Sequence, residues 1–123
     1  MISIIDDDLL VRESTADLIS SLGHEVFTFG SGEQFLASGR LKDTACIVTD
    51  LHMPGLNGFD LQSRLLAEGN RTPIIFITAY PKDASRSRAL NAGAVAFLSK
   101  PFEESALISS LETALKRRKE FER

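Results

Sequence analysis

Short apolar runs alternate with longer amphipathic segments along the whole chain. Runs of this length and composition are typical of buried strands, and they lie at about 2–6, 25–29, 45–49, 74–78 and 95–99. The segments between them are long enough for helices, which we expect at about 9–22, from Ser31, and at about 58–68, 82–91 and 103–119. This alternation predicts a parallel sheet with right-handed crossovers, so the expected fold class is α/β with three layers, α/β/α. The pattern alone leaves the strand order open.

The predicted elements differ in polarity. The strand at 25–29 is shorter and more polar than the others, which favours an edge position. The helix at 82–91 is the least apolar of the helices. The first helix has Asp7 or Asp8 as a plausible N-cap. The stripe of that helix that we expect to face the core consists of Val11, Thr15, Leu18 and Leu22.

Composition limits the class of protein. With 123 residues, 43% of them hydrophobic and 25% charged, residues 1–123 are expected to form one soluble globular domain. The net charge of −3 argues against a nucleic-acid surface over the whole domain. The single cysteine, Cys46, excludes a disulfide framework, and we expect a buried, inert thiol. No signal peptide and no run of the ~20 apolar residues of a membrane span is found, so we expect a cytoplasmic protein.

Four of the apolar runs end in reactive side chains. The first leads into Asp6-Asp7-Asp8, the third into Asp50, the fourth into Thr78 and the fifth into Lys100. If the strands are parallel, these endings meet at the carboxyl edge of the sheet, where ligands bind in open α/β sheets. Carboxylates, a hydroxyl and an ammonium together suit a hard cation and a phosphoryl group.

The acidic residues have two interpretations. Taken alone, Asp6-Asp7-Asp8 also fits a solvated turn that caps the next helix. Asp50 ends a second strand, however, and two unit charges ~4 Å apart repel by about 4 kcal/mol at an effective dielectric constant of 20. A divalent cation would offset that repulsion, and Mg²⁺ takes one or two carboxylates while leaving room for phosphate oxygens. The absence of a histidine and cysteine cluster argues against zinc.

Lys100 and Thr78 would complete a phosphoryl site. Lys100 supplies a compact positive charge and Thr78 a short hydroxyl. Each also has a simpler interpretation, as a surface lysine and as a strand-end residue of high β-propensity. A carboxylate can act as a nucleophile and form an aspartyl-phosphate, and phosphoryl transfer needs chiefly positioning and charge neutralisation. Asp50 is therefore the candidate acceptor.

Taken together, these motifs resemble the receiver domain of two-component response regulators. Each motif is weakly specific, but the set at these spacings is highly specific and covers essentially the whole chain. The matching segments are Ile4-Ile5-Asp6-Asp7, Thr49-Asp50-Leu51-His52-Met53-Pro54-Gly55-Leu56-Asn57-Gly58, Ile77-Thr78-Ala79 and Lys100-Pro101-Phe102. The loop at 53–60 is similar to that of receivers in nitrogen-fixation-type transcription regulators.

The resemblance implies a flavodoxin-like sheet in the order 2-1-3-4-5 and a signalling function. Asp50 would accept a phosphoryl group from a histidine kinase or a phosphotransfer protein. The Mg²⁺ ligands that the resemblance implies are Asp6, Asp7, Asp50 and the backbone carbonyl of His52. The residues that would bind the phosphoryl group or switch are Thr78, Ala79, Lys100 and Phe97. The Lys100–Pro101 peptide would be cis.

Some positions depart from choices that are common in the family. Asn57 stands where many receivers carry Asp, and Phe97 stands where Tyr is frequent. Phe97 can fill a pocket but cannot donate a hydroxyl hydrogen bond. His52 and Tyr80 flank the acceptor, at positions thought to tune phosphate lifetime in the family. We interpret the His52 side chain as a surface imidazole.

Two other functions share parts of the pattern. A Mg²⁺-dependent phosphatase with an aspartate nucleophile, as in haloacid-dehalogenase-like enzymes, would use Asp6. That fold usually carries a cap insertion, for which this chain has no room. A flavodoxin would need a loop rich in Ser, Thr and Gly after the first strand, where three aspartates would repel the phosphate. We therefore expect a signalling phosphoacceptor rather than an enzyme, although a receiver takes part in its own phosphotransfer and dephosphorylation.

Two outputs fit the end of the chain. Residues 116–123 include five basic and two acidic residues, which suits the solvated last turns of a helix. The same residues, from about 117, also suit the start of a linker to a DNA-binding domain outside this chain, and a stand-alone regulator is equally compatible. By resemblance, the face formed by 82–91, 95–99 and 103–119 is a candidate surface for a homodimer or an output partner.

Overall fold

The computed structural model describes the backbone of residues 1–121 and the side chains of residues 1–118. Its strands are β1 (Ile2–Ile5), β2 (Val26–Phe29), β3 (Cys46–Asp50), β4 (Ile74–Thr78) and β5 (Ala96–Ser99). Its α-helices are α1 (Leu9–Ser21), α2 (Gly32–Ala37), α3 (Gly58–Ala67), α4 (Asp83–Asn91) and α5 (Glu104–Phe121). Every predicted strand and helix is present, with boundaries within two residues of those predicted. A short 3-10 helix, η1 (Leu41–Asp43), was not predicted.

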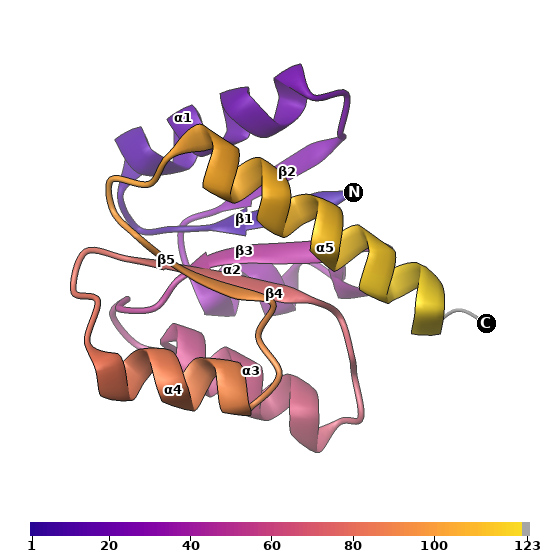
Figure 1. Ribbon diagram of the computed structural model, residues 1–123. Coiled ribbons are helices and arrows are strands. Elements are labelled where there is room, and N and C mark those ends of the chain that lie inside the picture. The colour runs from indigo at the N-terminus through magenta and orange to yellow at the C-terminus, as the bar shows by residue number, and fades with distance from the viewer. Residues whose placement is uncertain (122–123) are drawn as a thin grey trace.

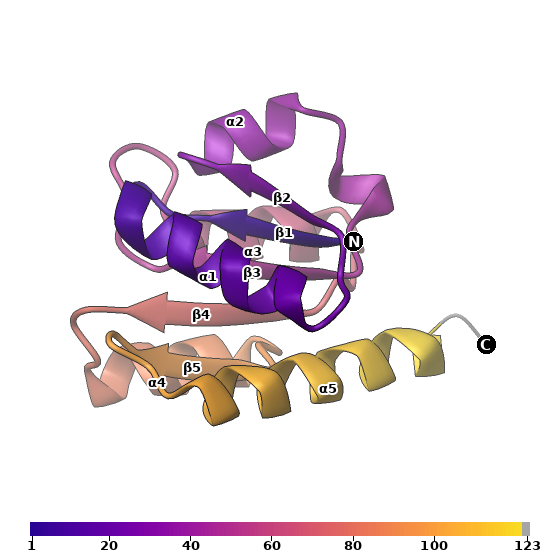
Figure 2. The ribbon, with the colours of Figure 1, turned by 90° about the horizontal axis from the view of Figure 1, so that it is seen from above.

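The strands form one parallel sheet in the order β2-β1-β3-β4-β5, so the flavodoxin-like order is confirmed. A hydrophobic cluster on one face joins the sheet to α1 and α5 through Ile19 and Leu107. A second cluster joins it to α2, α3 and α4 through Phe35, Leu61 and Ala89. Figures 1 and 2 show this three-layer arrangement, with α1 and α5 together on one side of the sheet.

Strand burial follows position in the sheet. Strands β1, β3 and β4 are buried at every residue, because helices cover both of their faces. Strands β2 and β5 lie at the edges and are partly exposed, which confirms the edge position predicted for β2. The strand arrowheads in Figure 2 point to the same end of the molecule, so the residues that follow the strands gather there.

The core face of α1 differs from the predicted stripe. Thr15 is buried, and Val11 and Leu18 pack against the core cluster as expected, but the second buried residue of the helix is Ile19. The inclusion of Leu22 was wrong, since its side chain is 40% exposed. The helix ends at Ser21, and the i, i+4 neighbour of Thr15 on its inner face is Ile19.

Helix α5 is longer than predicted and is attached to the domain near its end. It continues to Phe121, and the guanidinium of Arg118 donates a hydrogen bond of 2.6 Å to the carbonyl of Thr44. The chain is therefore helical at 117–121, where the start of a linker had been considered. Within the described residues, none of the helices is both long enough and apolar enough to span a membrane.

Cys46 lies inside β3 and is buried, as predicted. Burial raises the pKa of its thiol to about 12. The thiol therefore stays protonated at neutral pH and lacks the thiolate character that reactive cysteines need.

Candidate functional site

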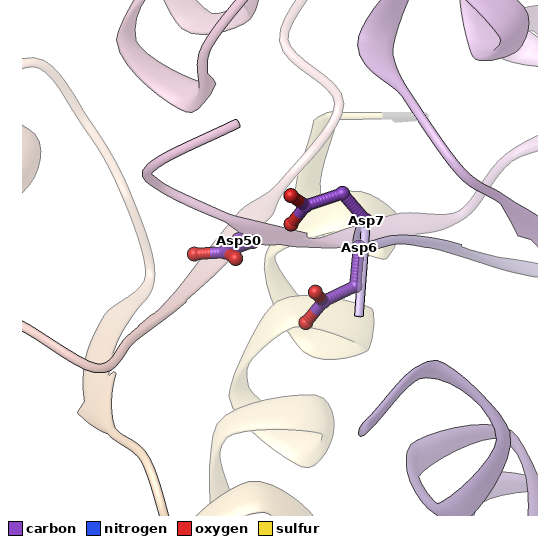
Figure 3. A group of neighbouring side chains, drawn as sticks. All are labelled: Asp6, Asp7 and Asp50. Carbon is purple, nitrogen blue, oxygen red and sulfur yellow. The ribbon is translucent and has the colours of Figure 1, made fainter. Parts of the chain in front are cut away.

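Three carboxylates converge at the carboxyl edge of the sheet. Ile5 of β1 is level with Thr49 of β3, so Asp6 lies beside Asp50, the last residue of β3. One carboxylate oxygen from each of Asp6, Asp7 and Asp50 lies within 4.8 Å of the other two (Figure 3). Asp6 and Asp50 are buried and Asp7 is exposed, so the cluster is open to solvent on one side.

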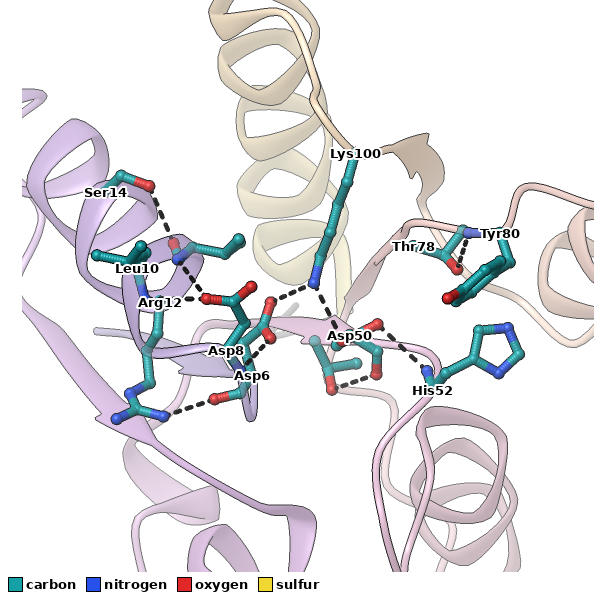
Figure 4. Close-up of polar contacts among 12 residues, drawn as sticks. Asp6, Asp8, Leu10, Arg12, Ser14, Asp50, His52, Thr78, Tyr80 and Lys100 are labelled. Atoms are coloured by element: carbon teal, nitrogen blue, oxygen red, sulfur yellow. Dashed lines mark hydrogen bonds and ion pairs between the residues drawn. The ribbon is translucent and has the colours of Figure 1, made fainter.

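Lys100 binds two of these carboxylates. Its Nζ lies 2.9 Å from Oδ2 of Asp6 and 3.0 Å from Oδ2 of Asp50 (Figure 4). Only 14% of the lysine side chain is exposed, so water screens these ion pairs less than it screens surface pairs. The simpler interpretation of Lys100 as a surface lysine is therefore not supported.

The pKa values of two groups reflect this burial and pairing. Burial raises the pKa of the Asp6 carboxyl above 3.8, and the hydrogen bond from Asp8 and the pairing with Lys100 offset part of the rise. Burial acts to lower the pKa of Lys100, but the bonds to Asp6 and Asp50 outweigh it and the pKa is raised above 10.5. Lys100 is therefore charged at neutral pH. Its pairing with Asp6 offsets only part of the free-energy cost of burying the Asp6 carboxylate.

Backbone N–H groups orient both buried carboxylates. The N–H of Asp8 donates to Oδ1 of Asp6 at 2.9 Å, and the N–H of His52 donates to Oδ1 of Asp50 at 3.2 Å. The Oδ2 atoms are thereby left to Lys100. The side chain of Asp8 also caps α1, so the turn that positions Asp6 also starts the helix.

Sequence reasoning missed Arg12 as part of this site. Its Nη1 donates a 2.7 Å hydrogen bond to the main-chain carbonyl of Asp6. The same atom would lie 3.3 Å from a Cβ placed on Gly30, so the arginine also approaches the β2–α2 loop. Arg12 thus ties α1 to the end of β1. Its position six residues after Asp6, in the first turns of the predicted helix, was the available signal.

Thr78 lies at the same edge, on β4. Its Oγ1 is fully buried and accepts a 3.1 Å hydrogen bond from the N–H of Tyr80, which leaves the hydroxyl hydrogen for a second acceptor. The main-chain N–H of Lys100 donates to the carbonyl of Thr78 at 2.7 Å, so the ends of β4 and β5 are joined here. Figure 4 shows Thr78 and Lys100 beside Asp50, and the exposed Ala79 follows directly.

The loop from β3 to α3 brings a helix close to Asp50. The N–H of Gly58, the first residue of α3, donates to the carbonyl of Leu51 at 2.9 Å. A Cβ on Gly58 would lie 2.8 Å from both the Asp50 carbonyl oxygen and the Phe76 ring, so only glycine allows this approach. The N–H of His52 is used by Asp50, and the metal role of its carbonyl stays a prediction.

The two residues that flank the site are in contact. The rings of His52 and Tyr80 pack edge to face, with centroids 5.7 Å apart and planes at 76°. Both side chains are exposed, and Tyr80 is 63% exposed. His52 therefore presents a surface imidazole, as interpreted from the sequence, but one held against an aromatic partner.

Phe97 is turned toward the core. Its side chain is 5% exposed and belongs to the cluster that contains Phe76 and Ala89. Its main-chain carbonyl, on the edge strand β5, accepts a 3.2 Å hydrogen bond from Nη1 of Arg86 in α4. Phe97, the candidate switch residue, is therefore connected to α4 both by its ring and by its backbone.

The Lys100–Pro101 peptide is cis.

The donor set of this edge fits a divalent cation. Oδ2 of Asp6 is buried and, among the described residues, has no hydrogen bond beyond its ion pair with Lys100. One ammonium for three carboxylates leaves an excess of negative charge. Because all the donors are oxygens, Asp6, Asp7 and Asp50 could hold Mg²⁺.

The fold and the site define a flavodoxin-like α/β domain with an acidic edge paired to a lysine. The family model for the response regulator receiver domain matches residues 2–112. The chain belongs to this family, and it is a receiver domain of the kind used in two-component signalling.

Similar proteins support this membership. The chain is 38% identical over 117 residues to nodulation protein W of Bradyrhizobium diazoefficiens, which covers 95% of this chain and 52% of that protein. It is 39% identical over 116 residues to the transcriptional regulatory protein FixJ of Azorhizobium caulinodans, covering 94% of this chain and 55% of that protein. The solved response regulator StyR superposes with a TM-score of 0.91 at 41% identity, covering 98% of this chain and 61% of that one.

The same matches also concern the length of the relatives, the loop at 53–60 and the phosphatase alternative. The chain spans about half the length of the curated relatives it matches. The loop similarity to nitrogen-fixation-type regulators agrees with the match to FixJ. The phosphatase alternative is not favoured, because the receiver model accounts for residues 2–112 in one continuous match.

Proposed function

We propose that Asp50 accepts a phosphoryl group from a phosphohistidine of a sensor kinase or of a phosphotransfer protein. The observation that supports this most is the bridging of Asp6 and Asp50 by Lys100 at the carboxyl edge of the sheet. Asp50 therefore lies beside the Lys100 ammonium and close to two further carboxylates, those of Asp6 and Asp7. The proposed reaction forms a bond between a carboxylate oxygen of Asp50 and phosphorus, while the P–N bond to the donor imidazole breaks.

The residues around Asp50 would bind the transferred group. Lys100 is shared by Asp6 and Asp50, and it can turn to the phosphoryl oxygens when Asp50 loses its charge. The Thr78 hydroxyl and the neighbouring backbone of Ala79 would supply further hydrogen bonds. A Mg²⁺ ion would neutralise charge on the phosphoryl oxygens, and the residues that would hold it are Asp6, Asp7, Asp50 and the carbonyl of His52.

The proposed switch runs from Thr78 to Phe97. A movement of Thr78 toward a phosphoryl group on Asp50 would free space beside β5, and the ring of Phe97 is the neighbouring group that can occupy it. Arg86 binds the Phe97 carbonyl, so α4 would respond to the same change. The face formed by α4, β5 and α5 would then bind a second copy or an output partner.

The whole protein is proposed to be longer than this domain. The relatives named as regulators extend well beyond the matched region, and one is named a transcriptional regulatory protein. A DNA-binding domain outside residues 1–123 is therefore the proposed output. A receiver that meets the kinase part of a sensor protein would act in the cytoplasm.

Phosphorylation of matched variants tests the acceptor. We expect acetyl phosphate with Mg²⁺ to add one phosphoryl group to the wild type, in a bond that hydroxylamine cleaves. Asp50→Asn should abolish the gain in intact mass, while Asp83→Asn, a surface aspartate of α4, should leave it unchanged. Undiminished labelling of Asp50→Asn would falsify the assignment, and a label on Asp6 would favour the phosphatase chemistry instead.

Thermal melts test the metal site. A cation that binds only the folded state stabilises it by RT ln(1 + [L]/Kd), which is about 1.4 kcal/mol at ten times Kd. We expect millimolar Mg²⁺ to raise the Tm of the wild type and of Asp83→Ala, but not that of Asp7→Ala. An equal rise in Asp7→Ala, or none in the wild type, would count against these ligands.

A further inference from the structure

A pocket of about 430 Å³ lies at the amino end of β4 and β5, at the opposite end of the sheet from the carboxylates. Its walls come from α3, the α3–β4 loop, the α4–β5 connection and α5. Figure 1 shows these segments at the end of the molecule where α5 finishes, away from the loop between β1 and α1. Small-molecule sites have volumes of about 300–1,000 Å³, and phosphoryl transfer makes no use of this pocket.

The pocket combines apolar surface with positive charge. Leu65, Leu66 and Ile74 are among its apolar lining residues, and two arginines, Arg71 and Arg117, also line it. Among the described residues that line it none is acidic, although the chain has 17 acidic residues against 14 basic ones. The charged side chains among these described lining residues are therefore both positive.

A polar side chain of the α3–β4 loop adds hydrogen-bond donors. Oδ1 of Asn70 already accepts hydrogen bonds from the N–H of Thr72 at 2.9 Å and from its hydroxyl at 2.6 Å. What the Asn70 side chain has left to offer a ligand is its NH₂ group. Guanidinium and amide donors above apolar walls are complementary to a molecule that is apolar at one end and anionic at the other.

We propose that this pocket binds an amphipathic organic anion, with an apolar carbon body and one carboxylate, sulfonate or phosphate group. The body would lie against Leu66, which is 53% exposed, and the anionic group would meet Arg117. Arg117 lies outside residues 2–112, which match the family model. The pocket thus depends on a residue beyond the matched part of the domain.

The pocket also lies against the end of α4. Through α4 we expect it to be coupled to the Asp50 site, and this coupling rests on the proposed function. Ala92 and Gly93, which follow α4, line it, and Gln62 in its wall donates a 3.1 Å hydrogen bond to the carbonyl of Ala89 in α4. A ligand held here favours one position of α4. Linkage then makes the effect reciprocal. A phosphoryl mimic at Asp50 that moves α4 changes the affinity of the pocket for its ligand, and the ligand changes the affinity of the Asp50 site for the mimic by the same factor.

The site can be tested with a pair of aromatic dyes that differ in charge. Anilinonaphthalene sulfonate is an amphipathic anion, and N-phenylnaphthylamine is its uncharged counterpart. We expect saturable binding of the sulfonate, with amide NMR shifts at 70–74, 92–95 and 117, and at least about fivefold weaker binding of the neutral dye. Equal affinities for the two dyes, or shifts centred on the exposed Leu9 and Leu10, would overturn the site.

Variants sharpen this test. Arg117→Gln should weaken binding of the sulfonate by about 1.4- to fivefold, the range of one exposed ion pair. Arg64→Gln is the matched control, because Arg64 is an exposed helix arginine outside the pocket, and it should change nothing. Leu66→Glu keeps a helix-forming residue at a half-exposed position but adds a repelling charge, and it should abolish binding. Unchanged binding in Leu66→Glu would contradict the proposal.

The coupling has its own readout. Beryllofluoride, a phosphoryl mimic, should change the affinity for the sulfonate dye at least about twofold in the wild type and leave Asp50→Asn unchanged. An unchanged affinity in a wild type that does accept phosphate would overturn the coupling. Failure of the phosphorylation itself would count against the proposed function, whereas dye binding to the unmodified protein does not depend on it.

Discussion

Helices α3 and α4 lie on the same side of the sheet and are attached to it by different means. Helix α3 buries Leu61 and Leu65, and its first turn is closed by a capping box between Asn57 and Asp60. Helix α4 buries Ala89, and no described side chain caps its first residue. Figure 1 shows the two helices side by side beneath the sheet.

Polar contacts take the place of apolar ones in α4. Arg86 donates to the carbonyl of Phe97, and the carbonyl of Ala89 accepts from Gln62. The guanidinium of Arg88 lies 4.0 Å from the centre of the Phe59 ring. Individual contacts of this kind contribute about 1 kcal/mol or less. Helix α3 is therefore anchored in the core by buried apolar side chains, while α4 can be displaced at modest cost.

The largest contrast should come from truncating one leucine in each helix. Leu61→Ala removes a fully buried side chain from α3 and should reduce the free energy of unfolding by about 2–5 kcal/mol. Leu90→Ala in α4 removes a side chain that is already 36% exposed and should cost below about 1 kcal/mol. Urea unfolding of both variants measures the difference. Equal losses in the two variants would contradict the difference in burial between α3 and α4.

The N-terminal caps should give a smaller contrast. Asn57→Ala removes the hydrogen bond from the Asp60 N–H to Oδ1 of Asn57, and should lower the free energy of unfolding by about 1 kcal/mol. The bond from the main-chain N–H of residue 57 to the Asp60 carboxylate stays possible. Asn57→Asp keeps the acceptor and should be nearly neutral. Lys82→Ala, at the corresponding position of α4, should stay within about 0.5 kcal/mol. A loss at Lys82 as large as that at Asn57 would show that α4 has a cap that its geometry does not reveal.

Arg86→Met should have the smallest effect on stability of these variants and the clearest effect on hydrogen exchange in α4. Arg86→Met removes the bond to the Phe97 carbonyl and should cost at most about 1 kcal/mol, but hydrogen exchange in α4 should become faster. Arg64→Met on α3 is the matched control, because its 4.0 Å pair with Glu68 is exposed, and it should leave exchange in α3 unchanged.

The same exchange measurement addresses the switch. Beryllofluoride should alter protection in residues 78–100, which include α4, and leave α3 unchanged beyond its first turn. Changes confined to the loop after Asp50 would show that the proposed switch does not operate. In the separate Arg86→Met experiment, hydrogen exchange that became faster in α3 than in α4 would contradict the view that α4 is the more easily displaced helix.

Local pattern was sufficient to predict the elements and the place of the site. The apolar runs define β1, β3 and β4, because a strand covered on both faces needs mostly apolar side chains, and less buried runs form the edge strands β2 and β5. Parallel strands bring their carboxyl ends to one edge, so the convergence of Asp6, Asp50 and Lys100 follows from their position after the strands. The strand order was supplied only by the family resemblance.

Other features depend on groups that are far apart in the sequence. The choice of Ile19 over Leu22 as a core residue of α1 was decided by where the helix ends against the sheet. Lys100 and Asp50 are 50 residues apart, and only the register of β3, β4 and β5 sets the 3.0 Å between them. The pocket near Arg117 arises where the ends of several elements meet without filling the space.

Local sequence features therefore specify which residues form the strands, which side chains follow them, and hence the chemistry available at one edge of the sheet. Hydrophobic periodicity and strand-end position are local properties, and they can be read from neighbouring residues. The packing of separate elements, by contrast, sets the bridge from Lys100 to two carboxylates, the bond from Arg12 to the carbonyl of Asp6, and the inward position of Phe97. Those outcomes depend on distances of a few ångströms between separate elements, which the packing of the whole domain sets.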